Sequence, residues 1–192
     1  MKPETFNTLP ILVVDGKAGN ARLLRGILLT LGISDVALAE DTDSALEIMA
    51  SNSFQAVFCD EAVGPLDAAG FVLAVRRNAG VRNPRTPIVL VSDGPQRAQV
   101  EQARDAGING LIVRPLSMNS VKRKLLALFQ TPKPFVETEA FFGPDRRRER
   151  DRRGARDDVE PATPLRDRRG GPLLRRQTDP DTPDAPDVPD AN

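Results

Sequence analysis

The chain has 192 residues, with 27 Lys and Arg, 27 Asp and Glu, a single Cys and no His. This length allows one ordinary domain followed by a tail. The lack of His excludes histidine acid/base catalysis and a histidine phosphoacceptor, and a single Cys excludes an internal disulfide framework. The N-terminus lacks a signal-peptide pattern and no apolar run approaches ~18 residues, so we expect a cytoplasmic protein without a membrane span.

Five short apolar runs, alternating with amphipathic segments, predict an α/β fold. The strands are expected at 10–14, 34–38, 55–59, 87–91 and 109–113. The helices are expected at 18–31, 42–51, 67–78, 95–106 and 117–129. Fully apolar strands of this kind are typical of a parallel sheet covered on both faces. Of the doubly wound strand orders, the flavodoxin-like 2-1-3-4-5 fits this length best.

Local signals place the ends of several helices. The first helix carries an apolar stripe made by Ala21, Leu24, Leu28 and Leu31, and Gly32 is expected to stop it in the left-handed conformation. Asp43-Ser44 and Ser117 are predicted as N-terminal caps of the second and fifth helices.

Two of the predicted strands are followed by an aspartate, Asp15 after the first and Asp60 after the third. In the 2-1-3-4-5 order these strands are neighbours, and ligands collect at the carboxyl ends of parallel strands. We therefore expect the two carboxylates to meet and to form a magnesium and phosphate site. The alternative for each acid alone is a helix cap or a solvated loop charge.

Four motifs carry a resemblance to a known family: ILVVDG, AVFCDEAVGPLD, PIVLVSD and GLIVRPLS. In this order and spacing they resemble the receiver domains of two-component response regulators, the CheY-like superfamily, over about residues 9–129. The stretch from ARDAGINGLIVRPLS through KPFVETEAFFGPDRRR is also similar to stand-alone bacterial receivers that end in an arginine-rich tail.

The resemblance implies phosphorelay signal transduction through protein–protein contacts. Asp60 matches the phosphoacceptor, which attacks a phosphoryl group and forms an aspartyl phosphate. Asp15 and Asp60 match carboxylates that hold Mg²⁺, while Ser92 and Arg114 match residues that contact the phosphoryl group. A histidine kinase or phosphotransfer protein is the expected donor, whereas the downstream target is not indicated. No DNA-binding or enzyme motif follows the receiver, so we predict a signalling protein and not an enzyme.

Four positions depart from the family pattern. Gly16 stands where the second acid of the first strand belongs, and Arg114 stands in place of a lysine. Leu111 replaces the aromatic switch residue of the fifth strand, and Ala68 replaces a loop glycine. These changes leave a second hypothesis open: a divergent pseudo-receiver that binds partners through a fixed surface and is not phosphorylated.

The missing acid and the arginine affect the metal site directly. Losing a ligand should weaken Mg²⁺ binding, since outer-shell losses alone typically cost about 10–100-fold. The planar fork of Arg114 prefers carboxylates or phosphates, so it could lie across Asp15 and Asp60 and substitute for the metal. Strand alternation predicts that Glu61 points away from the site.

We predict an N-terminal arm at 1–8, a receiver domain at 9–130 and a largely disordered tail at 131–192. Ten of the 17 prolines lie in this tail, which has too little apolar surface to offset its ordering entropy. Its aromatic residues, Phe135 and the pair Phe141-Phe142, either dock on the folded domain or wait for a partner.

The tail also separates charge into two blocks. Between Pro144 and Arg176 there are 12 Arg and seven acids, and between Gln177 and Asn192 there are five Asp and no bases. Such a tail can neutralise itself, or it can bind cyclic di-GMP, a nucleic acid or an acidic protein. The candidate anion-binding residues are Arg146, Arg147, Arg148, Arg152 and Arg153.

Overall fold

A computed structural model describes residues 9–77, 80–94, 97–138, 141–146 and 159–160. Its main sheet has the strands β1 (Ile11–Val14), β2 (Val36–Ala39), β3 (Ala56–Asp60), β4 (Ile88–Ser92) and β5 (Gly110–Val113). The five helices are α1 (Ala18–Thr30), α2 (Thr42–Ser51), α3 (Ala68–Arg76), α4 (Arg97–Ala106) and α5 (Met118–Gln130). All strands of this sheet pair in parallel in the order β2-β1-β3-β4-β5, which confirms the predicted flavodoxin-like fold.

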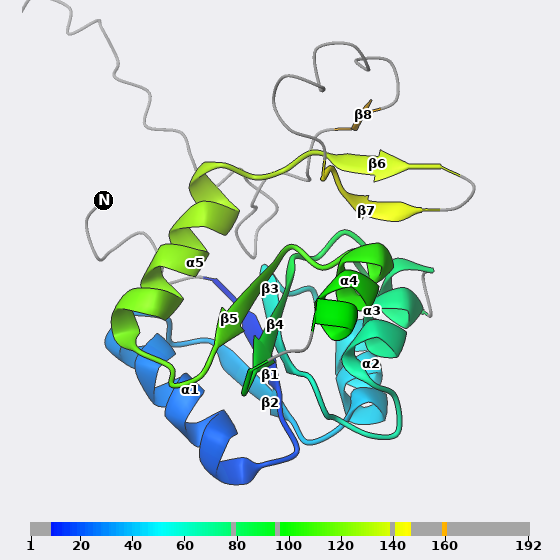
Figure 1. Cartoon of the computed structure of the whole chain (residues 1–192). Coiled ribbons are helices and arrows are strands. Elements are labelled where there is room, and N and C mark those ends of the chain that lie inside the picture. Colours follow the sequence, from blue (N-terminus) through cyan, green and yellow to red (C-terminus); the bar gives the residue numbers. More distant parts are fainter. Residues whose placement is uncertain (1–8, 78–79, 95–96, 139–140, 147–158, 161–192) are drawn as a thin grey trace, which may run out of the picture.

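Helices cover both faces of this sheet (Figure 1). Helices α1 and α5 lie on one face, where the predicted stripe of α1 is buried against residues such as Val13 and Phe58. Helices α2, α3 and α4 lie on the other, packed against residues such as Leu12 and Val57. Because successive side chains point to opposite faces, strands buried on both sides must be apolar throughout, as these runs are. No helix in the described ranges is long and apolar enough to cross a membrane.

The helix ends agree with the sequence signals in two cases out of three. Ser117 caps α5 by accepting a hydrogen bond from the Ser120 N–H at 3.1 Å, and Gly32 ends α1 with a positive φ of 89°. The predicted cap at Asp43-Ser44 is wrong. Asp41 caps α2 by accepting from the Ser44 N–H at 2.8 Å, because the helix already begins at the buried Thr42.

A hairpin follows α5, so the ordered chain continues past the predicted boundary at residue 130. Strands β6 (Phe135–Glu137) and β7 (Phe142–Pro144) pair antiparallel, and β6 also pairs with β8 (Val159–Glu160). Phe135 is buried and the Phe142 ring centroid lies 5.5 Å from the guanidinium carbon of Arg85, so aromatic residues of this segment dock on the domain. The disorder predicted for most of the tail falls on residues outside the described part of the chain.

The hairpin docks at the amino ends of β4 and β5 (Figure 1). Phe135 is 1% exposed and lies 5.1 Å from the guanidinium carbon of Arg76, measured to the ring centroid. Arg76 in turn donates hydrogen bonds to the carbonyls of Thr86 (2.9 Å) and Gly107 (3.0 Å). Burial lowers the pKa of Arg76 to about 9. This pKa is still above neutral pH, so Arg76 remains a cation there. A Cβ on Gly143 would lie 2.8 Å from the Gly107 Cα, so the two backbones touch directly.

Phe135→Ala should therefore lower the free energy of unfolding by about 3–5 kcal/mol, as expected for a buried aromatic side chain. Urea denaturation followed by circular dichroism measures the change. Leu23→Ala, at an exposed position of α1, is the matched control and should stay within about 0.5 kcal/mol of wild type. Equal midpoints for Phe135→Ala and wild type would mean that the hairpin adds no stability.

Candidate functional site

The parallel register brings four predicted residues to one edge of the sheet. Asp15 follows β1, Asp60 and Ser92 are the last residues of β3 and β4, and Arg114 follows β5. Asp15, Asp60 and Ser92 are 6%, 4% and 0% exposed. The predicted meeting of these residues at one edge is confirmed.

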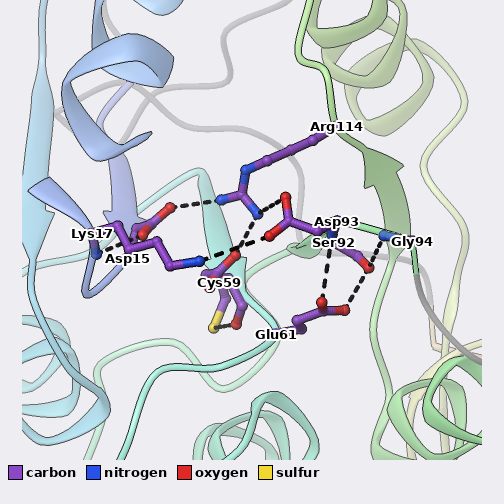
Figure 2. Close-up of polar contacts among 9 residues, drawn as sticks. Asp15, Lys17, Cys59, Glu61, Ser92, Asp93, Gly94 and Arg114 are labelled. Atoms are coloured by element: carbon purple, nitrogen blue, oxygen red, sulfur yellow. Dashed lines mark hydrogen bonds and ion pairs between the residues drawn. The ribbon is translucent and has the colours of Figure 1, made fainter. Parts of the chain in front are cut away.

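Arg114 holds the two buried carboxylates together (Figure 2). Its Nη2 donates to Asp15 Oδ2 at 2.7 Å and its Nη1 donates to Asp60 Oδ1 at 2.6 Å. Nη1 also reaches Asp93 Oδ1 at 3.3 Å. One guanidinium thus bridges both acids, in the position that the sequence suggested as a substitute for a metal ion. Charge-assisted pairs of this kind are among the strong hydrogen bonds of proteins.

The charges of the site shift one another's pKa values. Burial raises the pKa of Asp15, and the nearby Asp60 charge adds to this rise, while the Lys17 N–H and Arg114 oppose it. Burial also disfavours the Arg114 cation, but the Asp60 hydrogen bond and the charges of Asp60, Asp15 and Asp93 outweigh it and raise the pKa of Arg114. The guanidinium therefore stays charged and balances part of the negative charge at this edge of the sheet.

In this arrangement the residues do not fit a Mg²⁺ ion. The guanidinium fills the place between the carboxylates of Asp15 and Asp60. Gly16 offers no side-chain oxygen, and within the described ranges no three His, Cys, Asp or Glu side chains are grouped to hold a metal. Binding of the predicted magnesium would require Arg114 to leave both carboxylates.

Glu61 takes part in the site, so the prediction that it points away is wrong. Its Oε2 accepts the hydroxyl hydrogen of Ser92 at 2.5 Å, and its Oε1 lies 3.5 Å from the Asp93 backbone N–H (Figure 2). The alternation rule failed because Glu61 lies one residue beyond the end of β3, where the chain has already turned.

Sequence reasoning also missed Lys17 and Asp93. The Lys17 N–H donates to Asp15 Oδ1 at 2.8 Å, and its Nζ lies 3.8 Å from Asp93 Oδ2 across the mouth of the site. Their place in the sequence could have indicated this role, because both charged residues follow the end of a strand by one to three positions.

Two other predicted positions lie away from this cluster. Leu111 is partly buried against the core cluster that α2, α3 and α4 share with the sheet, and it provides no polar group. Arg146 pairs with Asp105 of α4 and stacks on Phe141 at 4.6 Å, so it belongs to the hairpin contact. The remaining anion-binding candidates, Arg147, Arg148, Arg152 and Arg153, lie outside the described residues.

Comparison with known proteins identifies the family. The family model of the response regulator receiver domain matches residues 11–126. The chain belongs to this family.

Relatives of the receiver include the chemotaxis protein CheY of Pseudomonas aeruginosa, 29% identical over 122 residues, which cover 64% of this chain and 97% of that protein. The receiver domain of the sensor histidine kinase PA1611 from Pseudomonas aeruginosa, with a magnesium ion in its active site cleft, aligns with a TM-score of 0.55 and 23% identity. It covers 62% of this chain and 94% of that one. A chain of the CheX-CheY-BeF3-Mg²⁺ complex from Borrelia burgdorferi aligns with a TM-score of 0.60 and 18% identity. The alignment covers 67% of this chain and 98% of that one. At these identities the two structures show the fold alone.

Gly16→Asp combined with Arg114→Lys should create a magnesium site in this receiver. The new carboxylate adds an oxygen ligand, and lysine cannot bridge two acids as a planar fork does. A Cβ at residue 16 would lie 3.3 Å from the Glu40 carbonyl oxygen, which needs only a small adjustment.

We expect the double variant to bind Mg²⁺ about 10–100-fold more tightly than wild type, measured by calorimetric titration. Arg97→Lys, on the exposed surface of α4, is the control and should leave the affinity of wild type unchanged. If the double variant and wild type bind equally, Gly16 and Arg114 are not what sets the metal affinity.

Proposed function

We propose that this receiver accepts a phosphoryl group on Asp60 from a histidine kinase or phosphotransfer protein and signals through protein–protein contacts. The observation that carries the proposal is the guanidinium of Arg114, which bonds both the acceptor carboxylate and Asp15 at the carboxyl edge of the sheet. A fixed cation at this point offsets the repulsion between a carboxylate and an incoming phosphoryl group. Membership of the response regulator receiver family also supports phosphoryl transfer to Asp60.

The transfer is a nucleophilic substitution at phosphorus. Within the described residues, Asp60 Oδ1 accepts the hydrogen bond from Arg114. The lone pairs of Asp60 Oδ2 can then attack the phosphorus atom. An oxygen–phosphorus bond forms while the phosphorus–nitrogen bond of the donor's phosphohistidine breaks. The electron pair stays on the imidazole nitrogen, which takes up a proton from water. Arg114 then pairs with the phosphoryl oxygens instead of the bare carboxylate.

Incubation with phosphoramidate should add one phosphoryl group to the wild-type chain, detected by intact mass spectrometry. Asp60→Asn should remove this label completely, because the amide is a poor nucleophile. Asp93→Asn is the matched control, since it neutralises another acid that contacts Arg114 but is 56% exposed, and it should retain the label. An unlabelled wild-type protein would reject Asp60 as a phosphoacceptor.

The same reaction in EDTA should proceed at the rate seen with Mg²⁺, because Arg114 already supplies the positive charge. Arg114→Gln should slow labelling about 10²–10³-fold, the range found when a donor that stabilises developing charge is removed. Time courses of intact mass with and without EDTA give both values. A wild-type rate that collapses in EDTA would show that a metal ion, and not Arg114, supports the transfer.

The second candidate is a binding module that is not phosphorylated. It is favoured by the same bridge, since Arg114 leaves the carboxylates of Asp15 and Asp60 already paired. In this version partners would bind a fixed surface of α4, β5 and α5, and the arginine-rich segment would contact an anionic partner such as cyclic di-GMP or a nucleic acid. Labelling of wild type at Asp60 would exclude this version.

A further inference from the structure

The hydroxyl of Ser92 both donates and accepts a hydrogen bond within the protein. Ser92 is fully buried, and it donates its single hydrogen to Glu61 Oε2 while accepting the Gly94 N–H at 3.1 Å. A serine hydroxyl has one hydrogen to donate. While that hydrogen points to Glu61, Ser92 cannot donate to an oxygen of a phosphoryl group on Asp60.

Glu61 also contacts the loop that leads into α4. Its second carboxylate oxygen faces the backbone N–H of Asp93, the first residue after β4, at 3.5 Å. One side chain just past the end of β3 therefore contacts two consecutive residues, the last of β4 and the first of the next loop (Figure 2).

We propose that Glu61 is a built-in competitor of the phosphoryl group for the Ser92 hydroxyl. The inference rests on the proposed phosphorylation of Asp60. A phosphoryl group brings about two negative charges next to the Glu61 carboxylate and is itself a strong acceptor. It takes over the hydrogen of Ser92, and like-charge repulsion drives Glu61 away from Ser92 and from the Asp93 N–H. The loop before α4 loses one of its anchors in the same event.

This competition gives the receiver two states that differ in defined contacts. In one state Glu61 holds Ser92 and the loop, and in the other the phosphoryl group holds Ser92. A ligand can shift an equilibrium only through such differential contacts. Leu111 is apolar and packed against the core, so it makes no polar contact that could change with phosphate. Glu61 has both the charge and the contact that a switch needs.

A double-mutant cycle separates this role from a purely structural one. Wild type, Glu61→Ala, Ser92→Ala and the double variant are phosphorylated with phosphoramidate, and the rate is followed by intact mass. Amide signals of Asp93 and Gly94 are recorded by NMR before and after labelling. Glu47→Ala, an exposed acid of α2, controls for the general loss of one negative charge.

We expect Glu61→Ala to be phosphorylated about tenfold faster than wild type, the size of one charge-assisted hydrogen bond. The acceleration should vanish in the Ser92→Ala background. The Asp93 and Gly94 signals of unmodified Glu61→Ala should shift toward those of phosphorylated wild type, while Glu47→Ala should match wild type in rate and spectrum.

Three outcomes would overturn the competition. Equal rates for Glu61→Ala and wild type would do so while leaving Asp60 as the phosphoacceptor. An acceleration of the same size in the Ser92→Ala background would show that charge alone acts, again without touching the role of Asp60. Absence of label in every variant would remove the phosphoacceptor assignment, and the competition with it.

Discussion

Two buried carboxylates that share one edge of a sheet need a positive charge between them, and in this receiver the guanidinium of Arg114 provides it. Asp15 and Asp60 are nearly inaccessible to water, so solvent cannot screen their repulsion. Leaving a buried charge without its partner typically costs about 3–5 kcal/mol. The geometry at the carboxyl ends of β1, β3 and β5 therefore depends on this bridge.

The same site contains a second contact between side chains, in which the charged partner is an anion and not a cation. Glu61 supplies an anion to the Ser92 hydroxyl, as Arg114 supplies a cation to the aspartates. The unmodified receiver is thus satisfied by its own side chains at both positions that a phosphoryl group would use. The proposed phosphorylation of Asp60 would exchange these contacts for new ones.

The opposite end of the sheet is occupied by the hairpin of β6 and β7. Phe135 and the buried Arg76 tie this hairpin to the amino ends of β4 and β5. Arg146, the first arginine of the arginine-rich segment, pairs with Asp105 near the C-terminal end of α4. The charged segment therefore starts at the end of the domain away from Asp60, so contacts made at the start of that segment and chemistry at Asp60 use different ends of the molecule.

The sequence by itself determined the alternating strands and helices and the position of Asp15, Asp60, Ser92 and Arg114 at or just after strand ends. Periodicity gives the strands but not their order, so 2-1-3-4-5 was only the order that best fitted this length, and the strand pairing is what brings those four strand ends to one edge. Only the tertiary structure decided the role of Glu61 and the docking of the hairpin. Glu61 lies past the last strand residue, where no periodicity applies. Arg76 and Gly107 lie about 30 positions apart, and a contact of that kind exists only once the chain has folded.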